Sequence, residues 1–117
     1  MAEARGVALL VPNLFTRIPV EGAVRAAGAE PVAVTSAAAA QKVGCRILIV
    51  DLDAPGAPTP DEISALTGGG VTVLGFGPHV EAARLAAARQ AGAVVLPRGA
   101  FLARLPQLLE TSLGHRE

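Results

Sequence analysis

Five short apolar runs recur along the chain and predict the strands of a sheet. They cover residues 7–11, 31–34, 47–50, 71–74 and 93–96. Each run is almost continuously apolar, whereas a strand with one face in water alternates apolar and polar residues. We therefore expect five strands that are covered on both faces, as in a parallel sheet.

Helical signals fill the segments between these runs. In the first, apolar residues follow the i, i+3, i+4, i+7 spacing from Val20 to Ala27, with Pro19 near the expected helix start and Gly28 at its end. Amphipathic spacing of this kind places one stripe of the helix against the sheet. A helix is therefore expected after the first strand.

The later helices show clearer end signals. Ser36 can cap an Ala-rich helix that ends at Gly44, and Thr59 with Glu62 forms the pattern of a capping box. A fourth helix is expected over residues 81–90, and a fifth follows the last strand. Strand and helix therefore alternate five times.

This alternation predicts an α/β fold. Parallel strands need right-handed crossovers, which divide the helices between the two faces of the sheet. The expected architecture is a flavodoxin-like, doubly wound (βα)5 domain over residues 1–117, with strand order 2-1-3-4-5. Folds of this type place their sites at the carboxyl ends of the strands.

Composition narrows the classes of partner. Ten Lys and Arg balance ten Asp and Glu, which argues against nucleic acid, because such binding needs a surplus of cations. Aromatic residues make up 3% of the chain, so platforms for stacking bases are scarce.

No apolar stretch approaches the length of a membrane span, and the N-terminus lacks a signal-peptide layout. Cys45 is the single cysteine, which fits a reducing compartment, so a cytoplasmic protein is expected.

Asp51 is the residue whose position most clearly suggests a chemical role. It ends the third predicted strand, and Pro55 follows four residues later. Here the chain resembles the receiver domains of response regulators, whose phosphoacceptor aspartate ends strand three and is commonly followed by a proline at this spacing. The resemblance extends over nearly the whole chain in the order and length of the elements.

The residues that assist phosphorylation in receivers are replaced. A phosphorylated carboxylate needs Mg²⁺ to neutralise and orient the phosphoryl group. Receivers supply two acidic residues after strand one, where this chain has Pro12 and Asn13. Gly77 stands in place of the Ser or Thr that ends strand four, and Leu96, before Pro97, stands in place of the Lys. The resemblance therefore implies a pseudo-receiver, which signals without aspartyl phosphorylation.

A structural role for Asp51 is the alternative that we favour over phosphorylation, because a carboxylate at a strand end often caps a turn. Asp53 could add a carboxylate to a weak cation site, although two acids on one loop are usually solvated. His79 opens the fourth helix and could bind a ligand, yet a surface or capping role is commoner. A small-ligand site built from Asn13, Asp51 and His79, at the carboxyl ends of strands one, three and four, stays open.

The sequence shows no recognisable arrangement of catalytic residues, and neither a metal centre nor a cofactor is expected. The histidines lie far apart with no cysteine pattern beside them, and the Gly75-x-Gly77 run lacks the dinucleotide fingerprint. The chain is therefore expected to be a non-enzymatic module that acts through protein contacts.

The fifth helix predicts where such contacts form. Leu102, Leu109 and Leu113 widen its apolar stripe beyond an ordinary buried face, and Ala82 and Ala86 give the fourth helix a flat neighbouring surface. A deep core contact is one explanation of this stripe, and a partner surface is the other. We expect a protein-binding face here, most simply in a two-fold homodimer.

Overall fold

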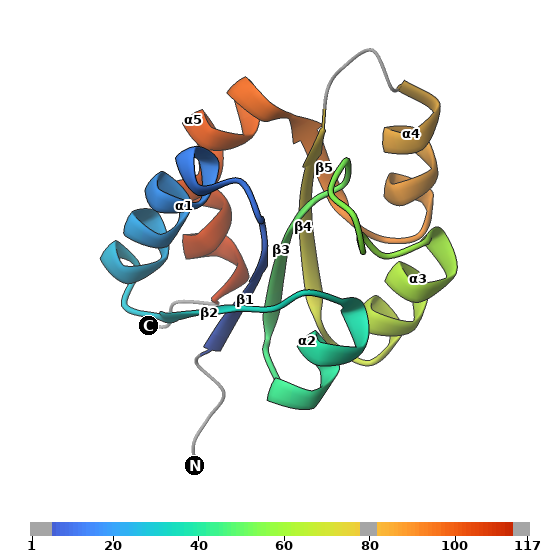
Figure 1. The fold of residues 1–117 in the computed structure, drawn as a ribbon, viewed down its shortest axis with the longest axis horizontal. Coiled ribbons are helices and arrows are strands. Elements are labelled where there is room, and N and C mark those ends of the chain that lie inside the picture. The colour runs from blue at the N-terminus through green and yellow to red at the C-terminus, as the bar shows by residue number, and fades with distance from the viewer. Residues whose placement is uncertain (1–5, 78–81, 114–117) are drawn as a thin grey trace.

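The computed structural model describes residues 6–77 and 82–113, and it contains a five-stranded parallel sheet in the order β2-β1-β3-β4-β5 (Figure 1). The strands are β1 (Gly6–Leu10), β2 (Glu30–Ala33), β3 (Ile47–Asp51), β4 (Thr72–Gly77) and β5 (Val94–Pro97). The helices are α1 (Leu14–Ala26), α2 (Ala37–Val43), α3 (Pro60–Gly68), α4 (Ala82–Gln90) and α5 (Arg98–Ser112). The predicted fold class and strand order are confirmed.

The helices divide between the two faces of the sheet, with α1 and α5 on one side and α2, α3 and α4 on the other (Figure 1). Strand side chains alternate between these layers. In β1, Val7 and Leu9 join the cluster with α1 and α5, whereas Ala8 and Leu10 join the cluster on the opposite face. Both faces of the central strands are thus buried, which explains their continuous apolar runs.

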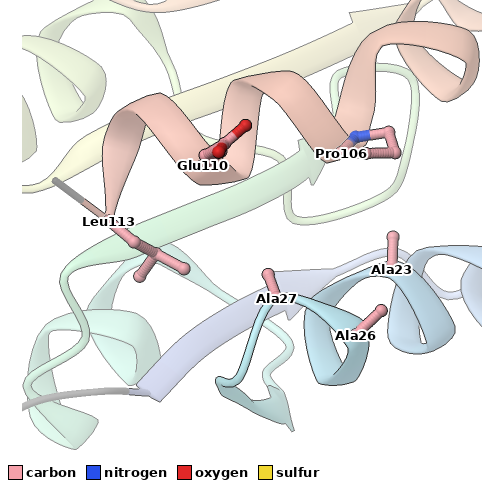
Figure 2. Close-up of a pocket in the computed structure, with 6 residues that line it drawn as sticks. All are labelled: Ala23, Ala26, Ala27, Pro106, Glu110 and Leu113. Atoms are coloured by element: carbon pink, nitrogen blue, oxygen red, sulfur yellow. The ribbon is translucent and has the colours of Figure 1, made fainter. Parts of the chain in front are cut away.

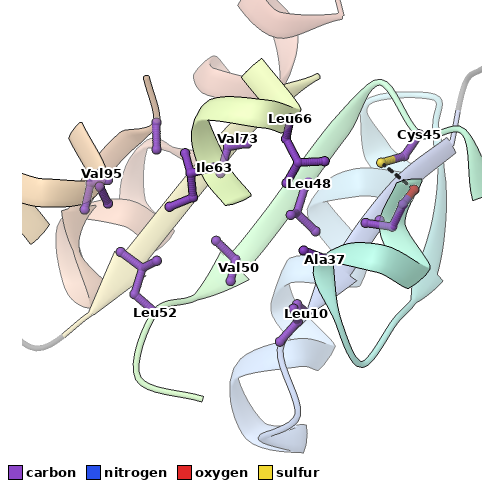
Figure 3. Close-up of a cluster of buried hydrophobic side chains, with 14 of the residues drawn as sticks. Leu10, Ala37, Cys45, Leu48, Val50, Leu52, Ile63, Leu66, Val73 and Val95 are labelled. Atoms are coloured by element: carbon purple, nitrogen blue, oxygen red, sulfur yellow. Dashed lines mark hydrogen bonds between the residues drawn. The ribbon is translucent and has the colours of Figure 1, made fainter. Parts of the chain in front are cut away.

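The second layer is packed from small and branched side chains (Figure 3). Ile63 and Leu66 of α3 share this cluster with Leu48 and Val50 of β3. Cys45 is buried at the edge of the same cluster, and its thiol donates a 3.5 Å hydrogen bond to the carbonyl of Ala40. Desolvation by burial raises the pKa of this thiol, which accords with a packing role for the cysteine.

The helix ends predicted from the sequence are present. The Ser36 hydroxyl accepts a 3.1 Å hydrogen bond from the Ala39 N–H, and Gly44 closes α2 with a positive φ of 69°. At α3, the Thr59 hydroxyl accepts from the Glu62 N–H, and the Glu62 carboxylate accepts from the Thr59 N–H. This reciprocal pair is the capping box expected from the residue spacing.

The first helix begins earlier than predicted. It starts at Leu14 rather than near Pro19, because the side chain of Asn13 accepts a 2.9 Å hydrogen bond from the Phe15 N–H and caps the helix there. Pro19 consequently lies inside α1. The earlier start adds a full turn of helix at the carboxyl edge of the sheet.

The apolar stripe of α5 faces the core, which corrects one part of the predicted interaction face. Phe101, Leu105 and Leu109 are buried against the sheet, and the rings of Phe101 and Phe76 lie 4.9 Å apart. Leu109 is 0% exposed, so it belongs to the core and not to a surface for a partner. The sequence shows the helical period of the apolar residues, but packing against the sheet determines which of them are buried.

Along residues 6–77 and 82–113, no helix is both long and apolar enough to cross a membrane.

The burial of Leu109 leads to a stability prediction. We expect Leu109→Ala to lower the free energy of unfolding by about 2–5 kcal/mol, because it leaves a cavity in a packed core. Leu113→Ala, at a half-buried position in the last turn, is the matched control and should cost clearly less. Urea denaturation followed by circular dichroism measures both. Equal losses would place Leu109 nearer the surface than the structure does.

Candidate functional site

Asp51 occupies the last position of β3, opposite Phe76 of β4 at the carboxyl edge of the sheet. It is 7% exposed. Its Oδ1 accepts a 2.9 Å hydrogen bond from the backbone N–H of Asp53, which closes the turn that follows the strand. The turn-capping interaction expected from the structural interpretation of Asp51 is therefore present.

An arginine approaches the other oxygen of this carboxylate. Nη2 of Arg98, the first residue of α5, lies 4.0 Å from Oδ2 of Asp51. The same guanidinium lies over the ring of Phe76, 5.6 Å from its centroid. The face of the Phe76 ring thus holds a cation near Asp51. Arg98 lies two positions after Leu96, the residue that stands where receivers carry their lysine.

A second arginine engages the neighbouring acid. Nη1 of Arg84, from α4, donates to Oδ1 of Asp53 at 3.2 Å and to the backbone carbonyl of Leu52 at 3.2 Å. The two charged side chains are about half exposed, so the pair itself adds little stability. Its main effect is to tie α4 to the loop after β3.

These two arginines disfavour a divalent cation at this edge. A Mg²⁺ ion needs carboxylate oxygens that are free to coordinate it. Here Asp53 is paired with Arg84, and Asp51 has one oxygen in a turn hydrogen bond and the other facing Arg98. A metal ion at these carboxylates would meet repulsion from both guanidinium groups.

Gly77 lies where a hydroxyl side chain would not fit without rearrangement. A Cβ added at Gly77 would lie 3.0 Å from Cδ2 of Leu85, which points toward it from α4. The Cβ of Leu52, a residue that is 4% exposed, lies 3.8 Å from the same added Cβ. Apolar packing therefore occupies the space beside this strand end.

The remaining residues of the predicted site have separate roles. Leu96 pairs in register with Phe76 and packs against the cluster beneath α1 and α5. Asn13 uses its side-chain oxygen to cap α1. His79 lies outside the described residues. The structure thus brings Asp51 and Asp53 together with two arginines, and it assigns Asn13 and Leu96 to helix capping and packing.

Sequence reasoning missed Arg84, Arg98 and Leu52. The signal for Arg98 was visible, because a basic residue directly follows Pro97 at the end of the fifth strand. Arg84 carried no such signal, since its role depends on how α4 lies beside the loop after β3. In the sequence, Leu52 looks like one more apolar residue, between Asp51 and Asp53.

A hollow of about 230 Å³ lies at the carboxyl ends of β1 and β2. Its lining comprises Leu10, Val11, Pro12, Arg17, Ala33, Val34, Thr35 and Pro55. Arg17 and Thr35 supply its polar side chains, and the rest is apolar. Within residues 6–77 and 82–113, no group of three or more His, Cys, Asp or Glu side chains could hold a metal ion.

The predicted interaction face is narrower than the sequence suggested. Ala82 and Ala86 are exposed on α4, whereas Leu102 and Leu113 are half-buried and pack against the core cluster. With Leu109 in the core, the exposed part of this face is the alanine surface of α4.

The sequence matches no family model and no curated protein. Solved structures with a similar fold include a response regulator receiver protein from Burkholderia phymatum, 20% identical, with a TM-score of 0.73 over 95% of this chain and 96% of that one. A response regulator receiver domain protein from Clostridium thermocellum is 12% identical, with a TM-score of 0.74 over 95% and 94% of the two chains. The beryllofluoride-activated NtrC4 receiver domain dimer is 13% identical, with a TM-score of 0.67 over 92% and 98%.

The fold is that of the receiver domains of response regulators. This agrees with the resemblance inferred from Asp51, Pro55 and the order of elements.

The hydrogen bonding of Asp51 yields a second prediction. We expect Asp51→Ala to lower the free energy of unfolding by about 1–3 kcal/mol, because the Asp53 N–H loses its acceptor. Asp51→Asn keeps an oxygen at this position and should cost less. Asp53→Ala, at an exposed side chain, is the control and should change stability by at most about 0.5 kcal/mol.

Urea denaturation of the three variants distinguishes two origins of the effect. Equal losses for Asp51→Ala and Asp51→Asn would show that the charge, and not the turn hydrogen bond, carries the contribution of Asp51.

Proposed function

We propose that this chain is a pseudo-receiver: a non-enzymatic regulatory module that signals through protein contacts without phosphorylation of Asp51. The observation that carries the proposal is the engagement of both Asp51 oxygens, one by the Asp53 N–H and one facing Arg98. A phosphoryl group would have to enter a nearly closed position already supplied with a turn donor and a cation.

The surrounding positions support the same conclusion. Phosphoryl transfer to a carboxylate needs a metal ion to offset the accumulating negative charge. The positions after β1 hold Pro12 and Asn13, and Asn13 is committed to capping α1. The side chain that would contact the phosphoryl group from β4 is absent at Gly77, where Leu85 fills the adjoining space.

The mode of action that we propose is association with protein. The exposed alanines of α4, Ala82 and Ala86, form a flat surface on which a partner can pack closely. Arg84 of the same helix is tied to the loop after β3, so a partner bound to α4 would also sense the conformation of that loop. We further propose that residues 1–117 act as one module in the cytoplasm, and that the chain forms a homodimer.

The proposal predicts no reaction with phosphodonors. Incubation with acetyl phosphate and Mg²⁺ should leave the intact mass of the protein unchanged, because the part of the chain that the structure describes forms no acidic metal site at Asp51 and Arg98 faces its Oδ2. Intact-mass spectrometry under non-acidic, rapid conditions measures this. The same treatment of a known active receiver provides the positive control.

A gain of one phosphoryl group that disappears in Asp51→Asn would contradict the proposal and restore a phosphorylated receiver. A gain that persists in Asp51→Asn would reflect modification elsewhere and leave Asp51 unphosphorylated, as proposed.

A small-ligand-binding domain is the second candidate, favoured by the hollow of about 230 Å³ at the carboxyl ends of β1 and β2. Its polar groups, Arg17 and Thr35, suit a small anionic molecule. The pseudo-receiver proposal predicts that native mass spectrometry of freshly purified protein finds no stoichiometric small molecule. A bound species that is lost in Arg17→Ala would favour the ligand-binding function instead.

A further inference from the structure

The three phenylalanines of the chain have opposite environments. Phe76 and Phe101 are both 0% exposed and pack against each other in the core. Phe15, in the first turn of α1, is 90% exposed, and its neighbours Leu14 and Ile18 are 54% and 57% exposed. Exposed apolar residues that cluster in this way mark sites of association more often than isolated ones do.

Two of these exposed residues, Phe15 and Ile18, belong to a longer stripe along α1. At 100° per residue, Phe15, Ile18, Gly22 and Ala26 project from one side of the helix, opposite the buried Val20. The stripe carries no charged side chain. Gly22 adds a place where a second helix can come close, because a Cβ added there would meet nothing within 4 Å.

An apolar groove lies at the other end of the same helix, between the last turns of α1 and the adjoining part of α5 (Figure 2). It has a volume of about 390 Å³. Its lining comprises Ala23, Ala26, Ala27, Pro106, Glu110 and Leu113. A cavity of about 150 Å³ is enough to hold a benzene ring, so this groove has room for a phenylalanine side chain.

We propose that a second copy of this chain covers α1, with the two α1 helices antiparallel and Phe15 of each copy seated in the groove of the other. Phe15 and Ala26 are separated by about 16 Å along the helix, at 1.5 Å per residue. A two-fold axis near the middle of α1 therefore brings each Phe15 to the partner's groove at the same time. Such reciprocity is the defining property of a two-fold interface.

The charges around the groove favour a second copy of this chain as its occupant. The groove carries one acidic side chain, Glu110. The first turn of α1 contains no acidic residue and presents the positive end of the helix dipole. Antiparallel pairing brings the helix start that carries Phe15 to the groove that carries Glu110, so the positive end of the helix dipole meets an acidic side chain, although Arg25 also lies in the last turn of α1.

Sedimentation velocity over a concentration series tests the proposal. The wild type should show a monomer–dimer equilibrium. Phe15→Ala removes the inserted ring and Ala26→Glu blocks the groove, so each should raise the dissociation constant at least about tenfold. Ala38→Glu makes the same chemical change at an exposed position of α2, outside both proposed surfaces, and is the matched control, which should dimerise like the wild type. All three positions are exposed, and circular dichroism confirms that each variant is folded.

A mixture of Phe15→Ala and Ala26→Glu gives the sharpest test. In the mixed dimer, the intact Phe15 of one copy meets the intact groove of the other, so one of the two contacts survives. The mixture should therefore dimerise more strongly than either variant alone. A structural disturbance caused by the substitutions would not produce this recovery.

Three results would overturn the proposal: a wild type that stays monomeric at high concentration, a dimer indifferent to Phe15→Ala and Ala26→Glu, or a mixture without recovery. Loss of the dimer in Ala86→Glu alone would move self-association to α4. The proposal rests on the homodimer proposed above, which a monomeric wild type would also remove, whereas a dimer indifferent to Phe15→Ala and Ala26→Glu would leave that homodimer standing. None of these outcomes bears on phosphorylation of Asp51.

Discussion

The third strand is buried along its whole length and ends in a carboxylate, and the arrangement of the carboxyl edge follows from that. Moving a charged group out of water is costly unless it is paired and hydrogen-bonded. Asp51 meets this demand through the Asp53 N–H and through Arg98, which is itself positioned over Phe76. In a phosphorylated receiver, a metal ion and a lysine would take up the negative charge at this position. Here the Asp53 N–H and the Arg98 guanidinium lie beside the carboxylate instead.

This internal compensation limits what the carboxyl edge of the sheet can bind. A site that waits for a phosphoryl group must keep space and uncommitted ligands. Leu52 and Leu85 fill the space beside β4, and Arg84 engages Asp53. The edge is thereby a structural junction that joins α4 and the start of α5 to the loop after β3. Under the pseudo-receiver proposal, signals enter and leave this module by contacts with other protein surfaces.

The two helical layers are unequal in a way that matters for such contacts. On the side of α2, α3 and α4, helices of small residues pack closely on the sheet. On the other side, only α1 and α5 cover the strands, and the groove between them stays open toward the end of α1. Phe15 lies at the opposite end of α1, exposed because it projects from the side of the helix opposite the buried Val20 and Val24.

The sequence by itself determined the fold. Continuous apolar runs require strands covered on both faces, and caps such as Ser36 and the pair Thr59 and Glu62 act through residues only three positions apart. Local spacing of this kind is readable from a single chain. The position of Asp51 at the end of β3 was readable for the same reason.

Tertiary structure alone decided what surrounds each of these residues. The partners of Asp51 and Asp53 include arginines from α5 and α4, and Arg84 lies 31 positions away from Asp53. Leu109 and Phe15 are both apolar helical residues, yet one is buried and the other is 90% exposed. Hydrophobic periodicity specifies that a helix has an apolar side, but which apolar residues are covered depends on the neighbouring elements. That information arises only when segments distant in the sequence pack together.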